Sequence, residues 1–112
     1  MIVGVPAETK EGEHRAAMTP DGVRELTAHG HTVVIQSGAG EGSSIPDDAY
    51  ARAGARVADA DAAWAAELVV KVKEPQPAET RRLRRDLVLF TYLHLAAYPE
   101  VADALLAAAR WR

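Results

Sequence analysis

Short apolar runs recur along this chain and are separated by stretches with helical spacing. The runs are rich in Val, Ile and Leu and have the length of strands. They cover residues 2–5, 32–36, 68–72 and 87–90, with a weaker run at 56–57. Start signals for the intervening helices are Thr19-Pro20, Pro46 with two aspartates, and Asp59 or Asp61. Helices are also predicted over residues 78–85 and 101–109.

Strands that alternate with helices predict an α/β fold. We expect a mainly parallel sheet covered on both faces, which is the Rossmann-like (flavodoxin-like) three-layer sandwich. With 112 residues, the chain is long enough for one small domain, residues 1–112. Right-handed crossovers place the loops that follow the strands on one side of the sheet. Ligands of such folds bind at that edge.

Polar residues that could bind a ligand or transfer a proton lie at or after the ends of three of the predicted strands. Arg15 lies in the loop after the first strand, and Lys73 ends the run that begins at Leu68. His94 comes just past the last strand, in Phe90-Thr91-Tyr92-Leu93-His94-Leu95-Ala96. The pattern therefore favours one ligand site that contains two cations and an imidazole.

Lys73 is a candidate donor to a substrate oxygen. A lysine partly desolvated at a strand end has a lowered pKa and can donate to a carbonyl oxygen as charge builds there. The alternative is a solvated lysine that lies over the sheet edge. Alternation along the strand places Lys71 and Lys73 on one face. Glu74 either orients Lys73 or balances its charge.

His94 and Arg15 each have two interpretations. His94 can exchange a proton near neutral pH, or it is a structural histidine bonded to the backbone. Arg15 can hold a substrate carboxylate through two parallel hydrogen bonds. Alternatively, it pairs at the surface with Glu11 or Glu13.

Two other clusters are not expected to bind a ligand. The segment Gly38-Ala39-Gly40-Glu41-Gly42-Ser43 resembles a dinucleotide fingerprint, but Glu41 would repel phosphate and no long helix follows. We expect its glycines to serve turn geometry or close backbone approach, and we expect no cofactor site in the chain. The arginines within residues 81–85 indicate a solvated helix end or a subunit contact. We also predict no metal site.

Composition narrows the class of protein. The net charge of −3 gives no general attraction to nucleic acid or to an anionic membrane. No apolar run is long enough to cross a bilayer. The chain has no cysteine, which fits a reducing cytoplasm and excludes thiolate chemistry. The final helix has no stop signal before Arg112, so we expect a fragment or a truncated product.

Five segments together resemble the alanine dehydrogenase and pyridine nucleotide transhydrogenase family. They are Gly4-Val5-Pro6-Ala7-Glu8-Thr9-Lys10, Arg15-Ala16-Ala17-Met18-Thr19-Pro20, residues 38–43, Lys71-Val72-Lys73-Glu74-Pro75 and residues 90–96. Their order and spacing match the family over nearly the whole chain. The last segment resembles alanine dehydrogenase more than the transhydrogenases.

The resemblance implies the N-terminal part of the substrate domain of an NAD-dependent enzyme. That enzyme deaminates L-alanine oxidatively to pyruvate and ammonia, and it forms a hexamer. Arg15 would hold the substrate carboxylate, Lys73 would contact the keto or amino centre, and His94 would be the acid/base. NAD would be bound by a nicotinamide-binding domain absent from these residues, so we expect no hydride transfer by the chain alone. A non-catalytic α/β binding or assembly module and part of a transhydrogenase-related protein are the alternatives.

Overall fold

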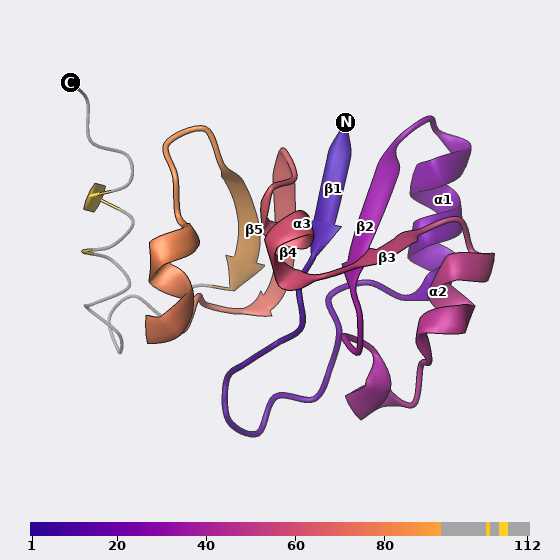
Figure 1. Cartoon of the computed structure of the whole chain (residues 1–112), viewed down its shortest axis with the longest axis horizontal. Helices are drawn as coiled ribbons and strands as arrows, with labels where there is room; N and C mark the ends of the chain where they lie inside the picture. The colour runs from indigo at the N-terminus through magenta and orange to yellow at the C-terminus, as the bar shows by residue number, and fades with distance from the viewer. Residues whose placement is uncertain (93–102, 104–105, 108–112) are drawn as a thin grey trace.

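An all-parallel sheet forms the centre of the molecule (Figure 1). The computed structural model describes residues 1–92, 103, 106 and 107. Within them, the strand order is β3-β2-β1-β4-β5. The strands are β1 (Ile2–Val5), β2 (Thr32–Gln36), β3 (Arg56–Ala58), β4 (Leu68–Lys73) and β5 (Val88–Tyr92). The predicted parallel α/β fold is confirmed.

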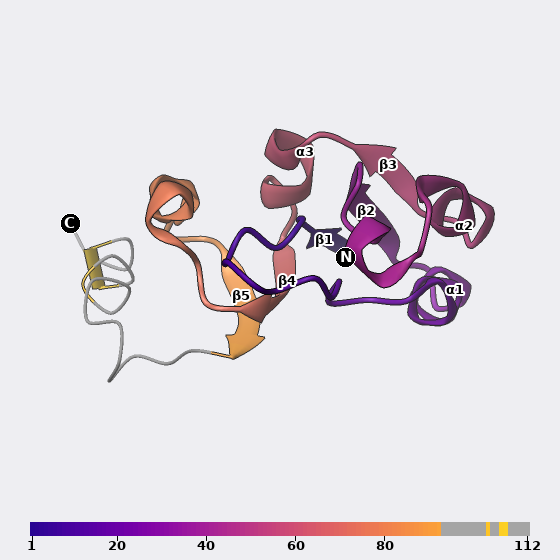
Figure 2. The same cartoon turned by 90° about the horizontal axis from the view of Figure 1, so that it is seen from below.

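Helices cover both faces of this sheet. They are α1 (Pro20–Ala28), α2 (Asp47–Arg52), α3 (Ala60–Trp64) and the 3-10 helix η2 (Pro77–Arg82). A further 3-10 helix, η1 (Glu41–Ser43), lies in the loop after β2 (Figure 1). Figure 2 shows α1 and α2 on one side of the sheet, with α3 and η2 on the other. This arrangement confirms the three-layer sandwich.

The helix starts follow the capping signals in the sequence. Thr19 accepts a hydrogen bond from the amide of Gly22 at 3.3 Å, and Pro20 takes the first helical position. Of the two aspartates proposed for α3, Asp59 is the cap: its Oδ1 accepts from the amide of Ala62 at 2.9 Å. Asp61 instead pairs with Arg82 at 2.7 Å.

Two predicted elements have different bounds in the structure. The helix predicted over 78–85 is a 3-10 helix that ends at Arg82, because Leu83 adopts an extended conformation. The strand predicted over 87–90 continues to Tyr92. Most of the helix predicted over 101–109 lies outside the described residues.

The two faces of β1 pack differently. Val3 and Val5 join the core with β2, α1 and α2, where each buried valine contributes about 1.5–3 kcal/mol. Gly4 faces α3, and a Cβ at Gly4 would lie 1.8 Å from the carbonyl oxygen of Ala63. Glycine is therefore required for α3 to pack directly on β1.

Candidate functional site at the carboxyl edge of the sheet

A small cleft lies where the loop after β1 meets the loop after β2. Its volume is about 140 Å³, and its lining residues are Ala7, Glu8, Glu13, His14, Arg15, Gly38, Ala39 and Gly42. Pockets for drug-sized ligands measure roughly 300–1,000 Å³, so this cleft suits a ligand of only a few heavy atoms. Its position at the carboxyl ends of β1 and β2 is the position expected for a ligand site.

Arg15 is held by Glu13 at this cleft. Nε and Nη2 of Arg15 each donate to the Glu13 carboxylate at 2.9 Å, and so does the amide of Arg15. The Arg15 side chain is 67% exposed, whereas that of Glu13 is 6% exposed. Glu13 occupies only one edge of the guanidinium, so the edge formed by Nη1 and Nη2 keeps donors for a second carboxylate. The predicted surface pair between Arg15 and Glu13 is therefore present. It leaves hydrogen-bond donors of Arg15 available for a substrate carboxylate.

Lys73 acts on the same carboxylate. The pKa of Glu13 is lowered to about 2, chiefly by the hydrogen bonds from Arg15 and to a smaller degree by the positive charges of Arg15 and Lys73. The two cations predicted to meet at one edge therefore both act on Glu13. Among the described residues, the Lys73 ammonium makes no hydrogen bond or ion pair with a side chain.

Lys71 has a different environment from Lys73. A β-bulge separates the pair Val70–Phe90 from the pair Lys73–Tyr92, and it interrupts the alternation on which a shared face was predicted. The Lys71 side chain is 1% exposed. Its ammonium lies 3.1 Å from Glu8, 3.5 Å from Glu79 and 6.0 Å from the ring centroid of Trp64. It is a buried structural cation.

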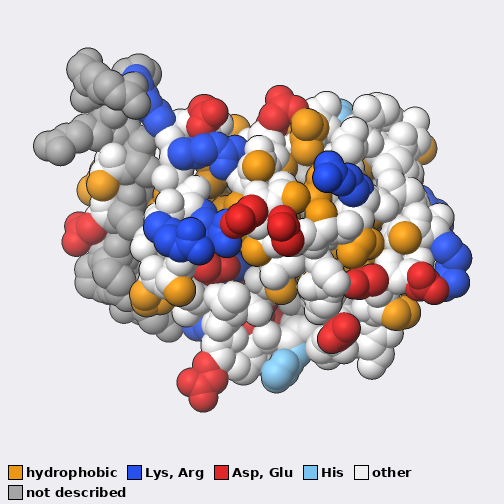
Figure 3. Space-filling view, viewed as in Figure 1, with side chains coloured by type: hydrophobic (Ala, Val, Ile, Leu, Met, Phe, Trp, Pro, Cys, Tyr) orange, Lys and Arg blue, Asp and Glu red, His pale blue; other side chains and the backbone are white. Residues whose placement is uncertain are grey.

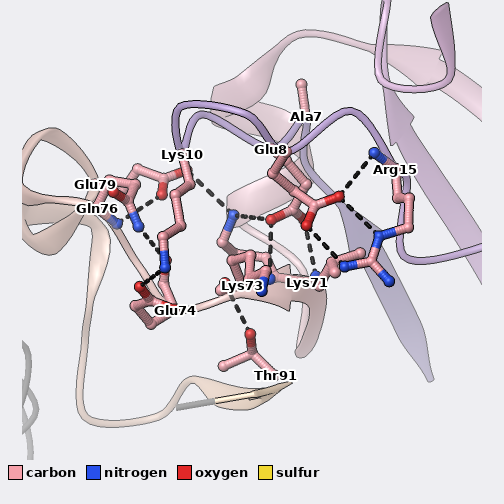
Figure 4. A network of polar contacts seen from close by, with 12 residues as sticks. Ala7, Glu8, Lys10, Arg15, Lys71, Lys73, Glu74, Gln76, Glu79 and Thr91 are labelled. Carbon is pink, nitrogen blue, oxygen red and sulfur yellow. Dashed lines mark hydrogen bonds and ion pairs between the residues drawn. The ribbon is translucent and has the colours of Figure 1, made fainter. Parts of the chain in front are cut away.

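Glu8 is the residue that sequence analysis missed. Figure 4 shows its side chain reaching from the loop after β1 toward the end of β4. Its carboxylate accepts from Lys71 Nζ at 3.1 Å, from the amide of Val72 at 2.9 Å and from the amide of Lys73 at 3.1 Å. The sequence analysis included Glu8 only within the segment Gly4-Val5-Pro6-Ala7-Glu8-Thr9-Lys10 and assigned it no role of its own.

Glu74 and His94 complete the predicted set. The Glu74 side chain is 1% exposed and forms an ion pair with Lys10 at 2.6 Å. Lys10 is a second residue that sequence analysis missed. His94 lies outside the described residues. It follows β5, whose last residue Tyr92 pairs with Lys73 at this edge.

The glycine-rich loop packs tightly against the loop that carries Arg15. A Cβ at Gly42 would lie 2.6 Å from the carbonyl oxygen of His14, and Ser43 Oγ donates to the same oxygen at 3.1 Å. At Gly40, a Cβ would lie 2.6 Å from both the Tyr50 ring and the Ile45 carbonyl oxygen. The prediction that these glycines serve close backbone approach is confirmed. Their space is filled by the chain itself, so they do not form a phosphate cradle.

The arginines of residues 81–85 lie away from this cleft. In Figure 3 the basic side chains near η2 lie beside acidic ones. A more open depression of about 380 Å³ lies there, and Arg81, Arg82 and Arg84 are among its lining residues. Arg84 donates to the carbonyl oxygens of Trp64 and Ala66, each at 2.6 Å. Arg84 therefore caps the end of α3, which is a structural role.

Residues 1–92, 103, 106 and 107 contain neither a metal-binding cluster nor a membrane-spanning helix. No group of three or more His, Cys, Asp or Glu side chains is arranged to hold a metal ion there. No helix in that part of the chain has the length and apolarity to cross a membrane.

Comparison with known proteins points to one family. Residues 4–110 match the family described as alanine dehydrogenase/PNT, N-terminal domain. The alanine dehydrogenase of Bacillus subtilis strain 168 is 55% identical over 106 residues, which are 94% of this chain and 28% of the relative. That of Mycobacterium tuberculosis strain H37Rv is 57% identical over 108 residues, which are 95% of this chain and 29% of the relative.

Solved structures give the same result. An L-alanine dehydrogenase structure superposes with a TM-score of 0.94 at 48% identity, and the match covers 96% of this chain and 30% of that chain. A transhydrogenase from Sinorhizobium meliloti has a TM-score of 0.89 at 34% identity, with 97% and 33% covered. This chain spans less than a third of the length of the curated relatives described above.

Proposed function

The chain belongs to the alanine dehydrogenase/PNT N-terminal domain family, and on that premise we propose that it serves an NAD-dependent L-alanine dehydrogenase. In that reaction, L-alanine, NAD⁺ and water give pyruvate, ammonium, NADH and a proton, and the reverse reaction aminates pyruvate. The residues of this chain form the first part of the substrate domain. They bind and orient the small oxoacid or amino acid.

Three residues have assigned roles in this proposal. Arg15 binds the substrate carboxylate through the guanidinium edge that Glu13 leaves available. Lys73 donates to the keto oxygen and stabilises the charge that develops there. His94 exchanges the proton. The supporting observation is that Arg15 and Lys73 both lower the pKa of one carboxyl group, Glu13. A substrate carboxylate at the outer edge of Arg15 would be attracted by the same two positive charges, and the negative charge of Glu13 would offset part of that attraction.

NAD supplies the hydride acceptor, and we propose that it binds outside residues 1–112. The glycine-rich loop does not fit a dinucleotide, because Gly40 and Gly42 are packed against Tyr50, Ile45 and His14. The steps assigned to this chain are therefore only those of substrate binding, orientation and proton exchange. We also propose a cytoplasmic homohexamer, on the family resemblance.

A chimera tests the proposal. Residues 1–112 replace the matching segment of the Bacillus subtilis alanine dehydrogenase, and NADH oxidation is followed with pyruvate and ammonium. We expect turnover. We also expect Arg15→Lys to raise the KM for pyruvate about tenfold or more, because an ammonium cannot form two parallel hydrogen bonds.

The matched control is Arg24→Lys. Arg24 forms an exposed pair with Asp21 at 2.7 Å on α1, away from the cleft, and its replacement should leave KM unchanged. A folded chimera without turnover would refute the proposal and favour a non-catalytic binding or assembly module. An unchanged KM in Arg15→Lys would refute the role of Arg15.

A further inference from the structure

Glu8 makes an unusual set of contacts for a loop glutamate. Its side chain is 2% exposed, and its two oxygens accept three hydrogen bonds, two of them from consecutive backbone amides. Those amides belong to Val72 and Lys73. A buried carboxylate with several N–H donors is fixed in place, because each lost bond leaves a desolvated group unpaired.

The position of these amides explains why a side chain binds them. β1 pairs with β4 at Val3–Leu68 and Gly4–Val69, which lie well before the end of β4. Beyond β1 comes Pro6, which has no amide hydrogen to continue a ladder. The Glu8 carboxylate thus takes the place of a strand neighbour for the last residues of β4.

The backbone at the end of β4 is also bonded on its other side, by β5. Thr91 Oγ1 donates to the carbonyl oxygen of Lys73 at 2.8 Å, and Lys73 pairs with Tyr92 beyond the bulge. The peptide that carries Lys73 is therefore bonded on one side by Glu8 and on the other by β5. The backbone, and with it the Cα–Cβ bond that aims the lysine side chain, has little freedom.

We propose that Glu8 is a positioning residue for Lys73: its carboxylate fixes the end of β4 so that the Lys73 ammonium is aimed at the substrate. This inference rests on the proposed function. Glu8 lines the cleft, but its carboxylate is buried and bonded to Lys71 and to the backbone of β4, so it acts on Lys73 through that backbone. A carboxylate is needed because a glutamine has one acceptor oxygen, and its NH₂ group would face the donors of Val72, Lys73 and Lys71.

The test is Glu8→Gln in the chimera, with kcat and KM for pyruvate measured separately. Arg15 still binds the carboxylate, so KM should change less than about threefold. Lys73 donates to the keto oxygen of the reacting centre, so kcat should fall about tenfold to a hundredfold, as for a catalytic group misplaced by about 1 Å. A merely structural glutamate would lower the amount of folded enzyme without this split.

Glu67→Gln is the matched control. Glu67 also accepts a backbone hydrogen bond, from the amide of Ile2 at 2.8 Å, but it lies just before β4, at the opposite end from Lys73. It should keep the parental kcat. If Glu8→Gln does not fold, Thr91→Val probes the same peptide from the other side, and its kcat should fall about threefold to tenfold with KM unchanged.

The outcomes separate the two proposals. An active parent chimera whose Glu8→Gln variant folds and keeps its kcat overturns this inference alone. Where that variant does not fold, an unchanged kcat in Thr91→Val has the same meaning. A folded but inactive parent chimera overturns the proposed function, and this inference with it.

Discussion

Removing the buried ammonium of Lys71 should destabilise the chain strongly. Lys71→Met keeps an apolar stem of similar length but leaves the carboxylates of Glu8 and Glu79 without the cation between them. These side chains are 2% and 7% exposed, so water does not replace the lost charge. Breaking a buried ion pair by removing one partner costs about 3–5 kcal/mol. That is a large fraction of the roughly 5–15 kcal/mol of a typical domain.

Equilibrium unfolding in urea measures this cost. Trp64 is buried beside Lys71 and reports through its fluorescence. With an m-value of about 2 kcal/mol per molar urea, the midpoint should fall by about 2 M. Adding Glu79→Gln to Lys71→Met should restore part of the loss, because it removes one of the two unpaired charges.

The control for this prediction is an exposed pair. Arg24→Met removes the partner of Asp21, and the two side chains are 59% and 92% exposed. The expected cost is about 0–1 kcal/mol. If Lys71→Met costs no more than Arg24→Met, the argument from burial is refuted, because the Lys71 cluster would then behave as a solvated one.

Two further predictions concern the cleft. Gly42→Ala should raise the KM for pyruvate of the chimera several-fold, because the new Cβ would lie 2.6 Å from the His14 carbonyl oxygen and must displace the Arg15 loop. Gly30→Ala strains the backbone, because Gly30 has a φ of +86°, but it lies between α1 and β2, at the other end of the strand from the cleft, and should leave KM unchanged. The Glu13 pKa of about 2, lowered from 4.5, means that its pair with Arg15 contributes stability above pH 4.5 and loses it as the pH falls through about 2. An NMR titration of the Glu13 carboxyl should show its midpoint rising toward 4.5 in Arg15→Gln, and an unmoved midpoint would contradict the assigned cause.

The strands and helix starts were predictable because their signals are local. Runs of β-branched residues predict strands wherever they occur, and Thr19-Pro20 is a start signal that needs no tertiary partner. The close backbone approach expected of the glycines after β2 is also found, at Gly40 and Gly42. These features depend on neighbours in sequence.

The features that were missed depend on neighbours in space. Glu8 looks like an ordinary loop glutamate until β4 brings two unpaired amides to it. Arg84 was expected to prolong a helix, but the end of α3 offers it two carbonyl oxygens. The β-bulge that separates Lys71 from Lys73 lies in the pairing of β4 with β5. The residues of β4 alone did not predict it.

The central place of β1 has a consequence for translation. The sequence has two methionines, and the second is Met18, which lies after β1 and the Arg15 loop. A polypeptide initiated at Met18 would lack the strand that joins β2 to β4, so the sheet would divide into two unlinked halves. Loss of so few residues would thus remove every strand pairing that joins β2 to β4 among the described residues.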